Sequence, residues 1–297
     1  MAGAGSQLSP LRLTEFRVTG AAAVLLPIVA AVTLGNRRAH RPARMTWDRR
    51  AVLVVVAYGL IAFVAVQSLY FVAIHRLPIG VALLIEYFAP ALVALWVVFV
   101  QHRPQPRATW FGIALTLVGL ALIARPWAGF ALDGIGVAAA LVAAAALAAY
   151  FLLAESAGER MPGLELCAWA ATVGAAALAL VLPWWSFPWR ALARHAELAG
   201  HPTPVWLLLV LVVVVGTVIA YLTGIGALTY LPAPVVAAVA TVEVVVASVT
   251  AWVLLDERLS TPEIVGGAVL LGGAVLAQRR STGALRQAAV VEGIVTP

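Results

Sequence analysis

The chain has 297 residues, of which 63% are hydrophobic and only 11% are charged, and its mean hydropathy is +1.01. A water-soluble protein of this length could not bury so much apolar surface, so the composition predicts an all-α polytopic membrane protein. The net charge of +6 does not indicate a nucleic-acid partner, because no basic run is interleaved with aromatic residues. A single cysteine, Cys167, excludes an internal disulfide and a cysteine-based metal site.

Nine membrane-spanning helices are predicted from the apolar runs that proline, glycine and arginine separate. At about 20 residues per span, each run is long enough to cross a bilayer as a helix. The predicted spans cover residues 10–35, 49–74, 78–100, 108–125, 133–155, 163–185, 204–228, 233–255 and 261–278.

The arginines between these runs predict the orientation of the chain, because cytoplasmic loops are enriched in arginine and lysine. Arginines are densest between Arg37 and Arg50, so we expect the loop after the first span to be cytoplasmic. Alternation from that loop places the N-terminus outside and the C-terminus in the cytoplasm, with a tail at 281–297. We therefore predict a multi-pass protein of the plasma membrane, embedded in the lipid bilayer.

The third predicted span carries a carboxylate, Glu86, deep inside an apolar run and four residues before Pro90. An ionisable side chain at that depth costs about 2.5–3.5 kcal/mol on insertion scales, so it indicates a functional site. Pro90 has no N–H to donate to the carbonyl of Glu86, and we expect the helix to be weakened there. Glu243 is the second carboxylate deep in a predicted span. For both, the alternative is a bond to a neighbouring helix that serves only the structure.

The second half of the chain repeats the first. Alignment of Leu77-Pro78 with Leu231-Pro232 sets the register. In this register, Gly112 aligns with Gly266 and Gly119 with Gly273, and before the anchor Gln67 aligns with Tyr221. This register predicts a first repeat of four helices at 1–126 and a second repeat of five helices at 133–280. Glycines seven residues apart lie on one face of a helix, where another helix can approach closely.

An odd number of spans per repeat inverts the second copy, which is the architecture of many secondary transporters. We therefore predict inverted five-helix repeats with the first helix missing, because the span at 133–155 has no partner in the first copy. Two explanations stay open: the opening helix is absent from this chain, or the protein natively has nine spans. The glycine faces could serve packing within one chain or between the chains of a homodimer.

With these residues in place, the chain resembles the EamA-type members of the drug/metabolite transporter superfamily. The motifs that carry the resemblance are Phe16-Arg17, Thr241-Val242-Glu243, Leu254-Leu255-Asp256-Glu257-Arg258-Leu259-Ser260 and Gly266-Gly267. The run from Leu84 to Pro90 is most similar to the threonine/homoserine exporter branch. The resemblance implies a ten-helix fold of two inverted repeats. The chain departs from the family in lacking the opening helix, in having Gln101-His102-Arg103 for an acidic turn, and in having Val244 where a proline is common.

Nine residues are predicted to bind substrate because they are polar groups within apolar spans or family positions. They are Glu86, Tyr87, Gln67, Tyr70, Tyr58, Tyr150, Tyr221, Glu243 and Arg17. For the tyrosines the alternative is packing, and for Arg17 it is snorkelling to the lipid headgroups. No metal site is predicted, because the five histidines lack the spacing of ligands on one helix. No nucleotide-binding loop, and hence no cofactor, is predicted either.

These features predict a secondary transporter and not an enzyme. It would export a small polar metabolite, such as an amino acid, by proton-coupled alternating access, with Glu86 binding substrate and proton in turn. One alternative is a transport-incompetent truncated homologue. Another is a membrane-embedded enzyme acting on lipid-linked substrates, for which the loop at 186–204 is the only weak candidate.

Overall fold

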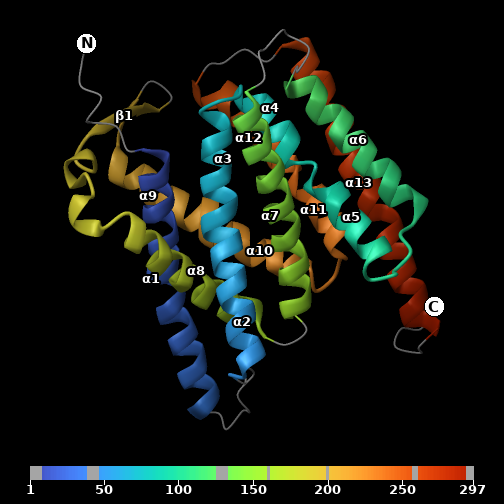
Figure 1. Cartoon of the computed structure of the whole chain (residues 1–297), viewed down its shortest axis with the longest axis horizontal. Helices are drawn as coiled ribbons and strands as arrows, with labels where there is room; N and C mark the ends of the chain where they lie inside the picture. Colours follow the sequence, from blue (N-terminus) through green and yellow to red (C-terminus); the bar gives the residue numbers. More distant parts are fainter. Residues whose placement is uncertain are drawn as a thin grey trace. The chain divides into compact units, whose positions relative to one another are not determined.

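The structure, a computed structural model, describes residues 9–38, 47–124, 133–158, 161–198, 201–255 and 260–291 (Figure 1). Almost all of the described chain is helical. The helices are α1 (Pro10–Arg38), α2 (Arg49–Tyr58), α3 (Val66–Ile74), α4 (Ile79–Glu86), α5 (Ala89–Phe99), α6 (Arg107–Ala124), α7 (Gly134–Gly158), α8 (Gly163–Val181), α9 (Val205–Val213), α10 (Ala220–Ala227), α11 (Ala233–Ala240), α12 (Val242–Leu255) and α13 (Thr261–Val291). A hairpin of two short antiparallel strands, β1 (His195–Leu198) and β2 (His201–Pro204), lies between α8 and α9.

Seven segments of the described chain are long and apolar enough to cross a membrane, from Leu11–Gly35 to Val205–Ala227. Two shorter apolar helices, Ala233–Val246 and Thr261–Ala277, follow them. These nine segments fall on the nine predicted spans. The prediction of an all-α polytopic membrane protein is therefore confirmed, and the hairpin is a small addition that the sequence pattern did not indicate.

The spans are interrupted at matching places in the two halves of the chain. The segments Gly59–Ala65, between α2 and α3, and Val214–Ile219, between α9 and α10, are π-helical. They coincide to within one residue in the register that aligns Leu77 with Leu231. Such π-helical segments are rare and are frequent at functional sites.

A second pair of interruptions also matches. Helix α4 ends at Glu86 and α5 begins at Ala89, while α11 ends at Ala240 and α12 begins at Val242. Both α4 and α11 begin directly after a proline, Pro78 and Pro232, at the N-cap position. A proline costs little at the start of a helix, because the N–H that it lacks would have no intrahelical partner there. The two halves of the chain are therefore alike in the positions of their helix breaks as well as in sequence register.

The chain divides into two compact units, which are described separately. Unit 1 contains Met1–Phe71 and Leu153–Gly226, and unit 2 contains Val72–Leu152 and Ala227–Pro297. Each unit thus combines segments from both halves of the chain. In unit 1, α1 packs against α8 and α9. A Cβ on Gly174 of α8 would lie 2.7 Å from Phe63, so the helices approach closely at that glycine.

In unit 2, α6 and α13 pack tightly along their glycines. A Cβ on Gly112 would lie 2.7 Å from the carbonyl oxygen of Gly273, and one on Gly119 would lie 2.5 Å from that of Gly266. The earlier glycine of α6 meets the later glycine of α13, and the later glycine of α6 meets the earlier one of α13. The two helices therefore run antiparallel, as equivalent helices of an inverted repeat must. The glycine faces therefore serve packing within the chain. Helix α13 also continues to Val291, past the predicted end of the span at 278.

The first turn of α7, also in unit 2, is capped by Asp133. Its Oδ1 accepts hydrogen bonds from the backbone N–H groups of Ile135 (2.8 Å) and Gly136 (2.9 Å), and its Oδ2 lies 3.2 Å from the guanidinium of Arg76. The N–H of Gly136, together with those of Ile135 and Arg76, lowers the pKa of Asp133 below its ordinary value.

Candidate functional site

In unit 2, Glu86 lies at the C-terminal end of α4 and is only 7% exposed. The helix stops there because the residues that follow turn away from α-helical bonding. Phe88 donates its N–H to the carbonyl of Ile85, three residues back, and Pro90 has no N–H to donate. The weakening expected from Pro90 is therefore observed. No ion pair among the described residues involves Glu86.

Glu243 lies across the second helix break, in the first turn of α12. Unlike Glu86, it is exposed in the described structure. It also does not occupy the position equivalent to Glu86, since Glu86 precedes its break and Glu243 follows the other one. The two carboxylates nevertheless interact electrostatically. Their neighbours Tyr87 and Val244 pack in one buried cluster with Leu120.

Two predicted tyrosines of unit 2 belong to its apolar packing. Tyr87 is 6% exposed and lies in the cluster that also contains Val244. Tyr150 of α7 is half-buried, and its ring lies 4.7 Å from that of Phe151 in an edge-to-face arrangement. Phe151 in turn packs against Ala89 and Val236. Tyr150 is thus held at the edge of the core that surrounds the α4–α5 break.

The remaining predicted residues lie in unit 1, around the two π-helical segments. The Nε of Arg17 donates to the Thr217 hydroxyl at 3.2 Å, and this hydroxyl donates to the carbonyl of Val212 at 3.0 Å. The Tyr221 hydroxyl donates to the carbonyl of Ala62 at 3.2 Å, and its ring stacks on Phe63 with centroids 4.5 Å apart. Each π-helical segment therefore accepts a hydrogen bond from a side chain of another helix. Arg17 of α1 bonds to Val214–Ile219, and Tyr221 of α10 bonds to Gly59–Ala65.

Tyr58, Gln67 and Tyr70 flank the first π-helical segment. Tyr58 is fully buried, whereas Gln67 and Tyr70 are half-buried on α3. The predicted binding residues thus fall into two groups. Unit 1 holds Arg17, Tyr58, Gln67, Tyr70 and Tyr221, and unit 2 holds Glu86, Tyr87, Tyr150 and Glu243.

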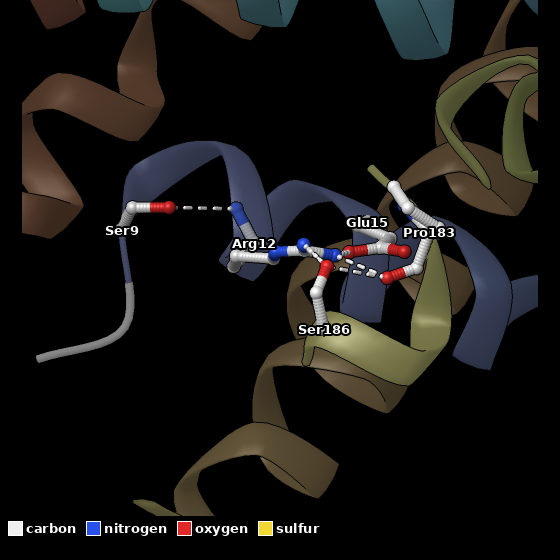
Figure 2. Close-up of polar contacts among 5 residues, drawn as sticks. All are labelled: Ser9, Arg12, Glu15, Pro183 and Ser186. Carbon is white, nitrogen blue, oxygen red and sulfur yellow. Dashed lines mark hydrogen bonds and ion pairs between the residues drawn. The ribbon is translucent and has the colours of Figure 1, made fainter. Parts of the chain in front are cut away.

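The sequence-based prediction missed a polar cluster at the start of α1 (Figure 2). Glu15 is fully buried, and its Oε2 lies 2.6 Å from the guanidinium of Arg12, which is 13% exposed. The same guanidinium donates to the carbonyl of Pro183 and the hydroxyl of Ser186, in the connection that follows α8. The second carboxylate oxygen, Oε1, has no partner among the described residues. The spacing of three residues on a helix was the signal that could have indicated the pair.

The acidic turn at 256–259 lies outside the described residues. Within the described ranges, no cluster of three or more histidine, cysteine or acidic side chains is placed to hold a metal ion.

Comparison with known proteins places this arrangement in a family. The model of the EamA-like transporter family matches residues 1–125 and 134–278. A solved crystal structure has the same fold, with a TM-score of 0.69 at 20% identity over 93% of this chain and 90% of that one.

Two curated relatives are 26% identical over 106 residues, which cover 34% of this chain and 94% of each relative. They are the probable 4-amino-4-deoxy-L-arabinose-phosphoundecaprenol flippase subunit ArnE of Salmonella enteritidis PT4 (strain P125109) and that of Salmonella gallinarum (strain 287/91 / NCTC 13346). The family match extends over nearly the whole chain, in agreement with the repeated, helical, multi-pass fold. The chain therefore belongs to the EamA-like transporter family and is a membrane transporter.

Proposed function

We propose that this transporter exports a small polar metabolite with an ammonium group, such as an amino acid, across the plasma membrane in exchange for protons. Its C-terminus would lie in the cytoplasm. The two repeats would rock about a central site and expose it to each side in turn. The resemblance of residues 84–90 to the threonine/homoserine exporter branch makes these amino acids the first substrates to test.

The observation that carries the proposal is the uncompensated burial of Glu86. The side chain is 7% exposed within a membrane span, and no described basic side chain forms an ion pair with it. A carboxylate in hydrocarbon is costly unless a cation or a proton neutralises it. A substrate ammonium and a proton can both do so, but not at the same time. Competition between them would couple substrate export to proton entry.

The helix break adds to this preference for a cation. Glu86 lies at the C-terminal end of α4, where the unsatisfied carbonyl groups give the helix end a partial negative charge. Interrupted helices in membrane transporters present such ends to substrates and coupling ions. Glu243, in the first turn of α12, has the opposite environment, because a helix N-terminus favours an anion. We therefore assign cation binding to Glu86 and a supporting electrostatic role to Glu243.

Transport by purified protein in proteoliposomes tests this function. With an acidic lumen and a neutral exterior, the wild type should accumulate labelled threonine or homoserine while protons leave, as reported by a trapped pH dye. Glu86→Gln should lower the rate about tenfold or more, because the neutral amide cannot neutralise an ammonium charge and does not take up a proton. Glu155→Gln, at the end of α7, is the matched control. Wild-type rates in Glu86→Gln would remove Glu86 from the mechanism.

The curated relatives favour a second candidate, the movement of a lipid-linked amino sugar. The amino sugar in the name of these relatives also carries an amino group, so the same carboxylate could bind it. Translocation of a fluorescent polyprenyl-phosphate amino sugar in the same proteoliposomes, measured by its protection from a membrane-impermeant reductant, distinguishes this candidate from amino-acid export. Folded protein that moves neither substrate class would favour the transport-incompetent alternative.

A further inference from the structure

The segment between α8 and β2 has a polar attachment of its own, which the proposed transport mechanism does not use. We name residues 182–198 the aromatic connection. Arg12 of α1 donates to the carbonyl of Pro183 and to the hydroxyl of Ser186 (Figure 2). Because Arg12 is also paired with the buried Glu15, the start of the aromatic connection is fixed to the first turns of α1.

The inner side of the aromatic connection is a small core of rings. Phe187 is 4% exposed, and its ring centroid lies 5.8 Å from that of Phe16, 5.1 Å from that of Trp184 and 4.7 Å from that of Trp189. These separations are those of packed aromatic pairs. The inner rings therefore pack on one another and give the connection a defined shape.

Its outer side is apolar and uncovered within the described structure. Trp185 is 87% exposed, and it follows Leu180 (87%) and Val181 (77%) at the end of α8. Trp189 is 52% exposed, and the neighbouring Arg190 is exposed as well. Because α8 is long and apolar enough to span the membrane, this strip continues from the end of a membrane helix into the aromatic connection.

We propose that the aromatic connection docks on an anionic phospholipid surface. Trp185 and Trp189 enter the headgroup region, and Arg190 binds a lipid phosphate. Tryptophan combines an apolar ring with one N–H donor and is enriched where hydrocarbon meets headgroups. A guanidinium offers a planar pair of donors that matches two phosphate oxygens. The attachment through Arg12 means that this contact would hold α1 and α8 at one depth in the bilayer.

Spin labelling in liposomes tests the depth of the connection. Cys167 is fully buried and is the only cysteine of the chain, so the unsubstituted protein measures background labelling. Trp185→Cys is compared with Leu180→Cys, at the exposed end of α8, and with Arg103→Cys, in the exposed loop after α5. The label at position 185 should be accessible to oxygen and shielded from a water-soluble nickel complex. Nickel accessibility as high as at position 103 would overturn the proposal.

A second arm tests the choice of lipid. In vesicles of phosphatidylcholine mixed with phosphatidylglycerol, the label at position 185 should lose more nickel accessibility than in phosphatidylcholine alone. Arg190→Gln should abolish this difference, whereas Arg103→Gln, which removes an equal charge from another exposed position, should leave it intact. An absence of any lipid effect, or an equal effect of the two arginine substitutions, would refute the phosphate contact. Both arms are independent of transport activity.

Discussion

Unit 1 and unit 2 each bury a carboxylate within a membrane span, but only the carboxylate of unit 1 has a basic side chain beside it among the described residues. Glu15 of unit 1 is fully buried and has a guanidinium 2.6 Å away, which is itself bonded to the connection after α8. Glu86 of unit 2 is 7% exposed and has no described basic partner. It lies next to a buried apolar cluster that contains Tyr87, Leu120 and Leu270. Glu15 thus has a neutralising partner within the protein, whereas Glu86 has none among the described residues, and the proposed function rests on this difference.

The largest expected effect comes from removing the partner of Glu15. Arg12→Gln leaves a buried carboxylate uncompensated, and the loss of one member of a buried pair costs about 3–5 kcal/mol. Unfolding by SDS in mixed micelles measures the change in the free energy of unfolding. The double variant Arg12→Gln/Glu15→Gln should recover most of it, because no charge then remains buried. Equal stability of the single variant and the wild type would show that Glu15 is not held by this pair.

Unit 2 should be most sensitive where its helices touch. Gly119→Ala places a Cβ 2.5 Å from the carbonyl oxygen of Gly266, which is backbone and cannot rotate away. Overpacking of this kind costs about 1–3 kcal/mol. Gly134→Ala is the matched control, because a Cβ there meets nothing within 4 Å, and its effect should stay within about 1 kcal/mol. Equal effects of the two substitutions would contradict the close α6–α13 contact.

Glu86→Gln, unlike Arg12→Gln, should not destabilise the protein. The amide removes a charge that no described side chain neutralises, so the SDS-induced unfolding midpoint should not fall, and transport alone should be lost. This variant is compared with Arg12→Gln in the same micelles. A clear loss of stability in Glu86→Gln would indicate that Glu86 has a structural partner, and the contrast between the two carboxylates would fail.

The smallest effect is expected at the exposed ion pair of unit 2. Arg76 and Asp133 are separated by 3.2 Å, and their side chains are 43% and 39% exposed, so the pair contributes little. Because the pKa of Asp133 is lowered in the folded state, its contribution is present above the unfolded-state pKa and is lost as the pH falls through the folded pKa. The thermal unfolding midpoint of Asp133→Asn should therefore be slightly below that of the wild type at neutral pH and converge with it in acid. A constant difference at all pH values would rule out ionisation as its cause.

Hydropathy and register were enough to predict much of the fold. The spans follow from run lengths, the end of α4 from Pro90, and the glycine faces from the internal alignment. The packing partners could also have been anticipated, since antiparallel equivalent helices bring Gly112 to Gly273 and Gly119 to Gly266. What remained open was whether these faces meet within one chain, which only the three-dimensional packing decides.

The candidate site was less predictable because burial depends on neighbours that are distant in sequence. Hydropathy placed Glu243 within a span but did not indicate that it lies in a first helical turn after a break, where it is exposed in the described structure. No proline follows the break at Thr241 as Pro90 follows the break at Glu86, so the sequence did not indicate it. The π-helical segments have the same apolar composition as the helices around them, so composition did not indicate them either. The pairing of Arg12 with Glu15 was readable from their spacing, but its attachment to Ser186 joins residues far apart in the chain.

The π-helical segments also determine which way the helices that follow them face. One extra residue in an α-helix turns every later side chain by about 100° around the axis, and a wider turn absorbs that rotation. Deleting one residue from Val214–Ile219 would restore regular winding and swing Tyr221 away from Ala62. The rotation of α3 and α10 about their axes therefore depends on the π-helical segments that precede them.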